Sequence, residues 1–208
     1  MTFFLLVLGL AHAGPPDTLG LVAEPAEVVA AYSKAATQRG RSGAAAKLDC
    51  RPAFDGLLFC LTLVTPQGWR YATQGDVQTW GMTSEQAHRQ AAQRLRTLGV
   101  AQRLSAQTVD GVPGSYHAAR LDDGQDAAPL LVPELLAAHI GGPPVVAVPA
   151  QGALIAWVPD NPALDTVVAV GVRRMYEDSD HAISPRIYRW GKDGWMVWGE
   201  AKKPQAKP

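Results

Sequence analysis

The sequence lacks any excess of charge, since lysine plus arginine and aspartate plus glutamate each number 19 among 208 residues. A chain without a basic surplus has no electrostatic footprint for nucleic acid or for an anionic membrane surface, so neither is expected as a partner. Long apolar runs are scarce as well. The run at residues 3–10 is far shorter than the ~20 residues that a membrane-spanning helix needs. We therefore expect no stable membrane insertion of the mature protein.

Motifs of catalysis and metal binding are also missing. The sequence has no G-x-S-x-G elbow, no S-x-x-K pair and no Walker loop. Its histidines after residue 13 are scattered, without the close spacing that is typical of zinc sites. We expect no cofactor and no metal. Asp178, Asp180 and His181 form the one cluster that a cation could use, and the alternative is a helix end that runs into a polar turn.

The start of the chain predicts export. Residues 3–10 lead into Ala11-His12-Ala13, and a glycine and two prolines follow. An A-x-A triplet before an extended segment matches the cleavage pattern of a signal peptide. Residues 1–13 are therefore predicted to be a signal peptide, and the mature protein to be periplasmic or extracellular. The alternative is a buried N-terminal strand.

The two cysteines, Cys50 and Cys60, are predicted to form a disulfide because pairing is the default in an oxidising compartment. Residues 44–54 and 57–65 are typical of two strands. A three-residue loop between them, with Gly56 left-handed, would place the cysteines directly opposite each other. Opposed residues at a non-hydrogen-bonded site lie ~4.5 Å apart at Cα, within the range of a disulfide. Free thiols in the core are the alternative.

Helical and strand patterns alternate along the rest of the chain. The clearest signal is a capping box at Thr83-Ser84-Glu85-Gln86, which predicts a helix that ends at Gly99. Further helices are predicted at 24–40, 130–140 and 161–177, and further strands at 68–71, 104–109, 115–121, 145–149, 153–158, 183–190 and 195–198.

The order of these elements predicts an α+β fold in which antiparallel hairpins pack on helices. Connections between consecutive strands are too short for parallel crossovers. Both halves read helix, two strands, helix, two strands, so we expect a structural repeat within one domain or two. The predicted organisation is an extended leader at 14–23, an N-terminal half at 24–125, a C-terminal half at 126–199 and a flexible basic tail at 200–208.

The last predicted hairpin is rich in aromatic residues. Trp190 and Trp195 bracket its loop and should face one another with Tyr188 beside them, while Trp198 lies on the opposite face. A strand pair that is aromatic on both faces is either buried between layers or presents rings to a partner. Both readings stay open, and these four residues are the candidates for partner contacts.

Three segments of the second half carry a family resemblance. They are Leu-Leu-Val-Pro-Glu-Leu at 130–135, Pro-Val-Val-Ala-Val-Pro at 144–149, and Ser-Pro-Arg-Ile-Tyr-Arg-Trp at 184–190 with Gly194-Trp195. In order and spacing they resemble the YtpQ-like bacterial family, a domain of unknown function. The resemblance covers about residues 80–198. It implies an α+β domain and supplies no catalytic residue.

Two functions compete on these observations. The first is an exported bacterial protein that binds a protein or peptide without catalysis, with another exported or envelope protein as partner and strand addition as the mode. The second is a hydrolase whose site is assembled from Asp160, Asp165, Asp178 or His181 near the end of the second half. A deep cleft that brings two of these together would favour the hydrolase. A purely structural envelope component is a third reading.

Overall fold

The computed structural model describes residues 19–65, 68–99, 103–119, 125 and 127–201. The predicted signal peptide at 1–13, residues 14–18 of the predicted leader and residues 202–208 of the predicted tail therefore lie outside the described residues. In the described part, helices pack on two sheets in which every strand pair is antiparallel. The α+β prediction is confirmed. No helix of this part is long and apolar enough to cross a membrane.

The first sheet is built around one long strand, β3, which pairs with β1 on one edge and with β2 and β4 on the other. Every residue of β1 is buried. The leader predicted at 14–23 is therefore, from Leu19 onward, an integral strand of the core, because its leucines pack inward against β3 and α3. The strands are β1 (Leu19–Pro25), β2 (Cys50–Pro52), β3 (Leu57–Thr65) and β4 (Gly68–Tyr71).

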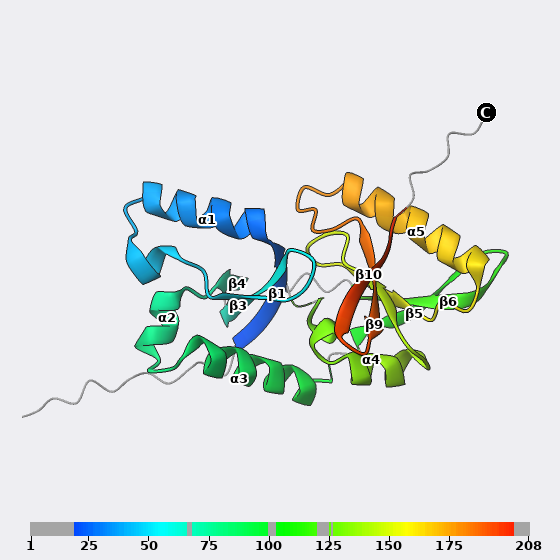
Figure 1. Ribbon diagram of the computed structural model, residues 1–208, viewed down its shortest axis with the longest axis horizontal. Helices are drawn as coiled ribbons and strands as arrows, with labels where there is room; N and C mark the ends of the chain where they lie inside the picture. Colours follow the sequence, from blue (N-terminus) through cyan, green and yellow to red (C-terminus); the bar gives the residue numbers. More distant parts are fainter. Residues whose placement is uncertain (1–18, 66–67, 100–102, 120–124, 126, 202–208) are drawn as a thin grey trace, which may run out of the picture.

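Four helical segments flank this sheet, and Figure 1 shows α1 and α3 on opposite sides of it. The predicted capping box of α3 is confirmed, since Thr83 Oγ1 accepts from the Gln86 amide and Gln86 Oε1 accepts from the Thr83 amide. Residues 44–46, predicted as strand, lie instead in a 3₁₀ turn, because glycine and alanine have no β-branched side chains to favour a strand. The segments are α1 (Ala26–Gln38), η1 (Gly43–Ala46), α2 (Gln74–Thr79) and α3 (Ser84–Thr97).

The second sheet has six strands in the order β10-β9-β7-β8-β6-β5. Successive side chains of a strand point to opposite faces. Val145 and Trp157 accordingly pack against α5, whereas Val146 and Leu154 join the core on the other face. The elements are β5 (Ser105–Val109), β6 (Val112–Ala119), η3 (Ala128–Leu131), α4 (Pro133–Ile140), β7 (Val145–Ala147), β8 (Leu154–Trp157), α5 (Pro162–Glu177), β9 (Arg186–Gly191) and β10 (Gly194–Glu200).

The division between the sheets does not coincide with the predicted halves. Strands β5 and β6 belong by sequence to the predicted half at 24–125, yet they pair within the second sheet, where β6 joins β8. The predicted order of elements is present from α4 to β10, whereas the first half also contains β4 and α2, and β1 begins in the predicted leader. One buried cluster extends from Leu19 and Leu61 to Val146 and Tyr188, so the two sheets share a core.

Candidate functional site

The cysteine hairpin forms as the sequence predicts. Cys50 and Cys60 are register partners on β2 and β3 and are joined by a disulfide. The turn has Gly56 in the left-handed region at φ 77°, and Asp55 also has a positive φ of 50°. Two left-handed residues close the three-residue loop, and this loop sets the register that brings the cysteines together.

The tip of this hairpin docks on strand β9 of the second sheet. The Phe54 ring meets the Tyr188 ring edge-on with centroids 4.8 Å apart. The Asp55 carboxylate accepts hydrogen bonds from the Tyr188 hydroxyl, at 3.1 Å, and from Arg186. Burial, together with the Asp55 charge, raises the pKa of Tyr188 to about 12. Tyr188 is fully buried, and Phe54 and Asp55 of the same chain contact it where the sequence predicts a partner contact.

The other aromatic candidates lie on the β9–β10 hairpin. Trp190 and Trp195 are register partners, as predicted, with ring centroids 5.2 Å apart. Trp195 is half-buried, and its Nε1 donates to the Leu130 carbonyl at 2.8 Å. Trp190 is 40% exposed and Trp198 is 42% exposed. These two indoles therefore remain available on the surface of the described structure.

Strand β10 forms one edge of the six-stranded sheet, and β5 forms the other. Met196 and Val197 are each 48% exposed, so the surface around Trp198 on β10 is apolar. We call the exposed residues Met196, Val197 and Trp198 the apolar edge. Strand β5, whose side chains are likewise exposed, carries Ser105 and Thr108 among its residues and is mostly polar. The two edges of one sheet thus present opposite chemistry.

The residues predicted for a hydrolase site are not brought together. Asp160 precedes α5, and Asp165 in its first turn accepts from Trp157 Nε1 at 2.8 Å. Asp178 caps the other end of this helix, 13 residues and therefore about 20 Å from Asp165 at 1.5 Å per residue. Among the described residues, no three histidine, cysteine or acidic side chains form a metal cluster, Asp178, Asp180 and His181 included.

Asp180 and His181 instead line a cavity between the two sheets, with a volume of about 370 Å³. At its base lies Glu24, the last but one residue of β1, which is 4% exposed. Glu24 Oε1 accepts a hydrogen bond from the Tyr71 hydroxyl and one of 2.9 Å from Gln151 Nε2. Burial raises the pKa of Glu24 in spite of these two donors. We call this pocket the Glu24 cavity.

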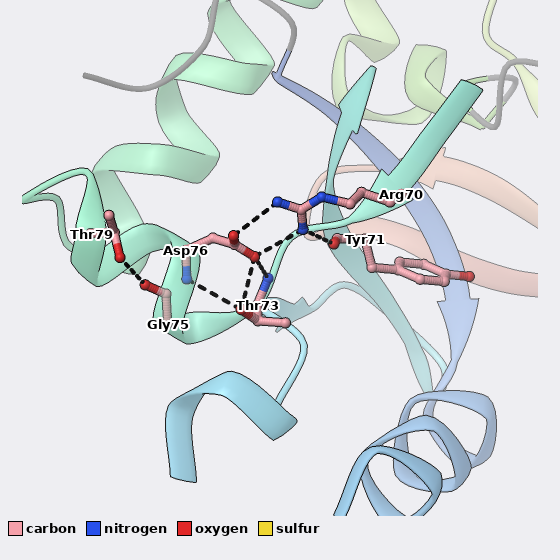
Figure 2. A network of polar contacts seen from close by, with 6 residues as sticks. All are labelled: Arg70, Tyr71, Thr73, Gly75, Asp76 and Thr79. Atoms are coloured by element: carbon pink, nitrogen blue, oxygen red, sulfur yellow. Dashed lines mark hydrogen bonds and ion pairs between the residues drawn. The ribbon is translucent and has the colours of Figure 1, made fainter. Parts of the chain in front are cut away.

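A polar network at the end of β4 holds Tyr71 in place (Figure 2). Arg70 forms a two-pronged ion pair with Asp76 at 2.9 and 3.0 Å, and Asp76 also forms the capping box of α2 with Thr73. Burial alone would raise the pKa of Asp76, but Arg70 and Thr73 outweigh it and lower that pKa to about 2. In Figure 2 the Tyr71 ring points away from this network. The ion pair therefore fixes the end of β4, while the Tyr71 ring lines the Glu24 cavity.

A second buried acid, Asp49, lies in the segment before β2. Its Oδ1 accepts from Ser84 Oγ at 2.6 Å and lies 3.0 Å from His88 Nε2. Burial alone would raise the pKa of Asp49, but hydrogen bonds from His88 and Ser84 lower it. His88 is only 7% exposed, because Asp49 packs against it. Ser84 and His88 of α3 each contact Asp49 and do not contact each other. These contacts attach α3 to the first sheet.

A larger cavity, of about 530 Å³, lies between α5 and strands β5, β6 and β8. Val167 and Met175 of α5 line this cavity and are 39% and 36% exposed. Gly171 lines the cavity from the middle of the helix. A Cβ added at Gly171 would meet no atom within 4 Å, so the absence of a side chain leaves the space open.

Sequence reasoning did not find the Glu24 cavity, because Glu24, Tyr71 and Gln151 are separated by 47 and 80 residues along the chain. None of the three stands in a recognisable motif. Glu24 and Tyr71 lie on β1 and β4 of the first sheet, whereas Gln151 lies in the turn before β8. No protein-family model, no curated protein and no solved structure matches this chain, which leaves the resemblance to the YtpQ-like family untested.

Proposed function

We propose that this is an exported bacterial protein that binds an extended segment of another exported or envelope protein, without catalysis, by adding it to strand β10. The apolar edge is the observation that carries the proposal. The disulfide and the signal-peptide pattern at residues 1–13 support export. We include the resemblance to the YtpQ-like family in this proposal, because one of the three segments that carry it covers β9, the strand that pairs with β10.

The backbone of β10 suits strand addition. In an antiparallel pair, the backbone N–H and C=O groups of successive residues point alternately toward the partner strand and away from it. The Trp190 amide donates to the Pro144 carbonyl, away from β10, so Trp195 opposite it turns its own backbone groups to the open edge. Val197, two residues on, does the same. A bulge between Val197 and Gly199 ends this regular stretch, which limits the added strand to a short segment.

The composition of β10 favours binding over protection. Exposed edge strands are usually blunted by lysines, prolines or inward-pointing charges, because unpaired backbone groups recruit other strands. The strand reads Gly-Trp-Met-Val-Trp-Gly-Glu, so its one charge is at the end that follows the bulge. Side chains on alternate faces would give an added peptide two apolar surfaces to contact, which is how strand addition gains specificity.

The hydrolase alternative has no comparable support. Of its four candidate residues, His181 alone lines the Glu24 cavity, while Asp160, Asp165 and Asp178 are distributed along α5. Asp165 is moreover engaged as the acceptor for a buried indole. We therefore do not propose hydrolysis.

Selection from a displayed library of random peptides on the purified protein tests the proposal. We expect enrichment of extended peptides with alternating apolar residues, and protection of the amides of Trp195 and Val197 from hydrogen exchange when such a peptide is bound. Replacing Met196 by lysine and Trp198 by glutamate should weaken binding at least about tenfold, since exposed anchors at strand-addition sites carry specificity.

A matched control is available on the other edge of the same sheet. Thr108→Glu adds a charge to β5, and peptide affinity should stay unchanged. Enriched peptides that protect β5 or the helices, and that bind the Met196→Lys, Trp198→Glu protein as well as the parent, would refute strand addition at β10.

A further inference from the structure

Glu24 is a buried carboxylate to which no cationic side chain of the described residues is hydrogen-bonded. It is 4% exposed, and its two hydrogen bonds come from a phenol and a carboxamide, neither of which carries positive charge. Buried charges are normally paired, because an isolated carboxylate loses its hydration. Asp49 shows the usual solution in this protein, since His88 lies against it at 3.0 Å. No described cation forms such a contact with Glu24; His181 lines the same cavity but acts on Glu24 only through space.

One oxygen of this carboxylate is left for a ligand. The hydrogen bonds from Tyr71 and Gln151 both end on Oε1, and no described donor reaches Oε2. A carboxylate can accept about four hydrogen bonds. Glu24 is therefore fixed in orientation by two donors and has acceptor capacity remaining, which is what a preorganised anionic contact requires.

Aromatic rings form the wall beside Glu24. Trp69 and Tyr71 both line the cavity, and their rings meet at 86° with centroids 5.2 Å apart. Tyr32 of α1 extends the cluster, 5.6 Å from Tyr71. Aromatic faces attract cations, and the attraction grows when the site excludes water. Among the described residues, no lysine or arginine lines this cavity, whereas a second acid, Asp180, lies at its rim beside His181.

We propose that the Glu24 cavity binds a primary alkylammonium group, presented by a small amine or by a lysine side chain. The ammonium would donate to Glu24 Oε2 at the base, with its alkyl chain along Trp69 and with Asp180 at the entrance. The cavity volume of about 370 Å³ is within the range of small-ligand sites. This site is distinct from the apolar edge and does not depend on the proposed function.

Binding should depend on pH because the ionised form of Glu24 makes the contact. The titratable groups around it are Tyr71 on β4, Tyr32 on α1, and Asp180 and His181 before β9. Affinity should rise as pH increases through the pKa of Glu24, which burial places above its usual range. A positive charge on His181 at the rim would weaken the binding of a cation, so the contribution of this residue is separated with the His181→Gln variant.

Calorimetric titration of the purified protein with n-butylammonium chloride tests the site directly. Glu24→Gln keeps the shape and removes the charge, and should weaken binding at least about tenfold, the scale of a lost charge-assisted hydrogen bond. Trp69→Leu should weaken it about threefold or more through loss of the ring face. Glu27→Gln, three residues away on the exposed start of α1, removes the same charge outside the cavity and should change nothing.

Other probes identify the source of the ammonium group and set the limits of the proposal. Equal affinity for n-butylammonium and for N-acetyl-lysine methylamide assigns the site to the group itself, and preference for the second assigns it to lysine side chains. Absence of binding by both at about 10 mM and pH 8 overturns the proposal. So does tighter binding of tetramethylammonium, which cannot donate, or a pH dependence that vanishes in His181→Gln and persists in Glu24→Gln.

Discussion

Removal of the disulfide gives the sharpest test of the fold. The bond closes a loop between residues that are 10 apart in sequence, and the chain-entropy relation for that length gives a stabilisation of about 2.7 kcal/mol at 25 °C. Replacing both Cys50 and Cys60 by alanine should lower the free energy of unfolding by about 2–3 kcal/mol. For a protein of this length the melting temperature should fall by roughly 5–10 °C.

Urea unfolding followed by tryptophan fluorescence measures this change. Parent protein treated with dithiothreitol should match the double variant, and dithiothreitol should have no effect on the variant itself. Because Phe54 and Asp55 dock on Tyr188, hydrogen exchange in β9 should also become faster when the bond is absent. Two free thiols in the denatured, unreduced protein, or identical unfolding of the variant and the oxidised parent, would refute the reasoning.

Two further predictions concern a helix glycine and a buried acid. Gly171→Ala should raise the free energy of unfolding by about 0.5–1 kcal/mol, because a helix-interior glycine is costly and its added Cβ meets open space; a melting temperature at or below that of the parent would contradict this. Asp49→Asn should cost about 1.5–3 kcal/mol at pH 7, the scale of hydrogen bonds to a charged group. The pKa of Asp49 is lowered in the folded protein, so its contribution is complete above the unfolded value near 4 and is lost as pH falls through the folded value. The difference between parent and variant in urea unfolding should therefore shrink below about pH 4, and a difference independent of pH would exclude the charged contact.

Local chemistry made part of this fold predictable. The capping box at Thr83 and Gln86 and the disulfide register between Cys50 and Cys60 each depend on residues within a few positions of one another or within one hairpin. The α+β class followed from short connections between strands. Helix α2 has its own box of Thr73 and Asp76, a signal that the sequence carries but that is weakened by Gly75 and by a length of six residues.

What could not be predicted depends on contacts between distant segments. The strand order of the second sheet pairs β6 with β8 and β7 with β9, and no hairpin spacing encodes either pair. Burial of His88 follows from Asp49, 39 residues before it. The Glu24 cavity requires β1, β4 and the turn before β8 to meet. Tyr188 is of a residue type that is common at binding surfaces, but its ring is covered by Phe54, which lies in a different hairpin.

Strand β1 has a consequence for how the chain assembles. It is the first described element to be synthesised, yet its strand partner is β3, and α3 and η3 also pack against it. The hydrogen bond from Gln151 to Glu24 comes from a residue 127 positions later. Until those segments arrive, the leucines of β1 have nothing to cover them, and such long-range pairing is slow to form. Between the synthesis of β1 and the arrival of the segments that pack against it, aggregation and proteolysis compete with folding.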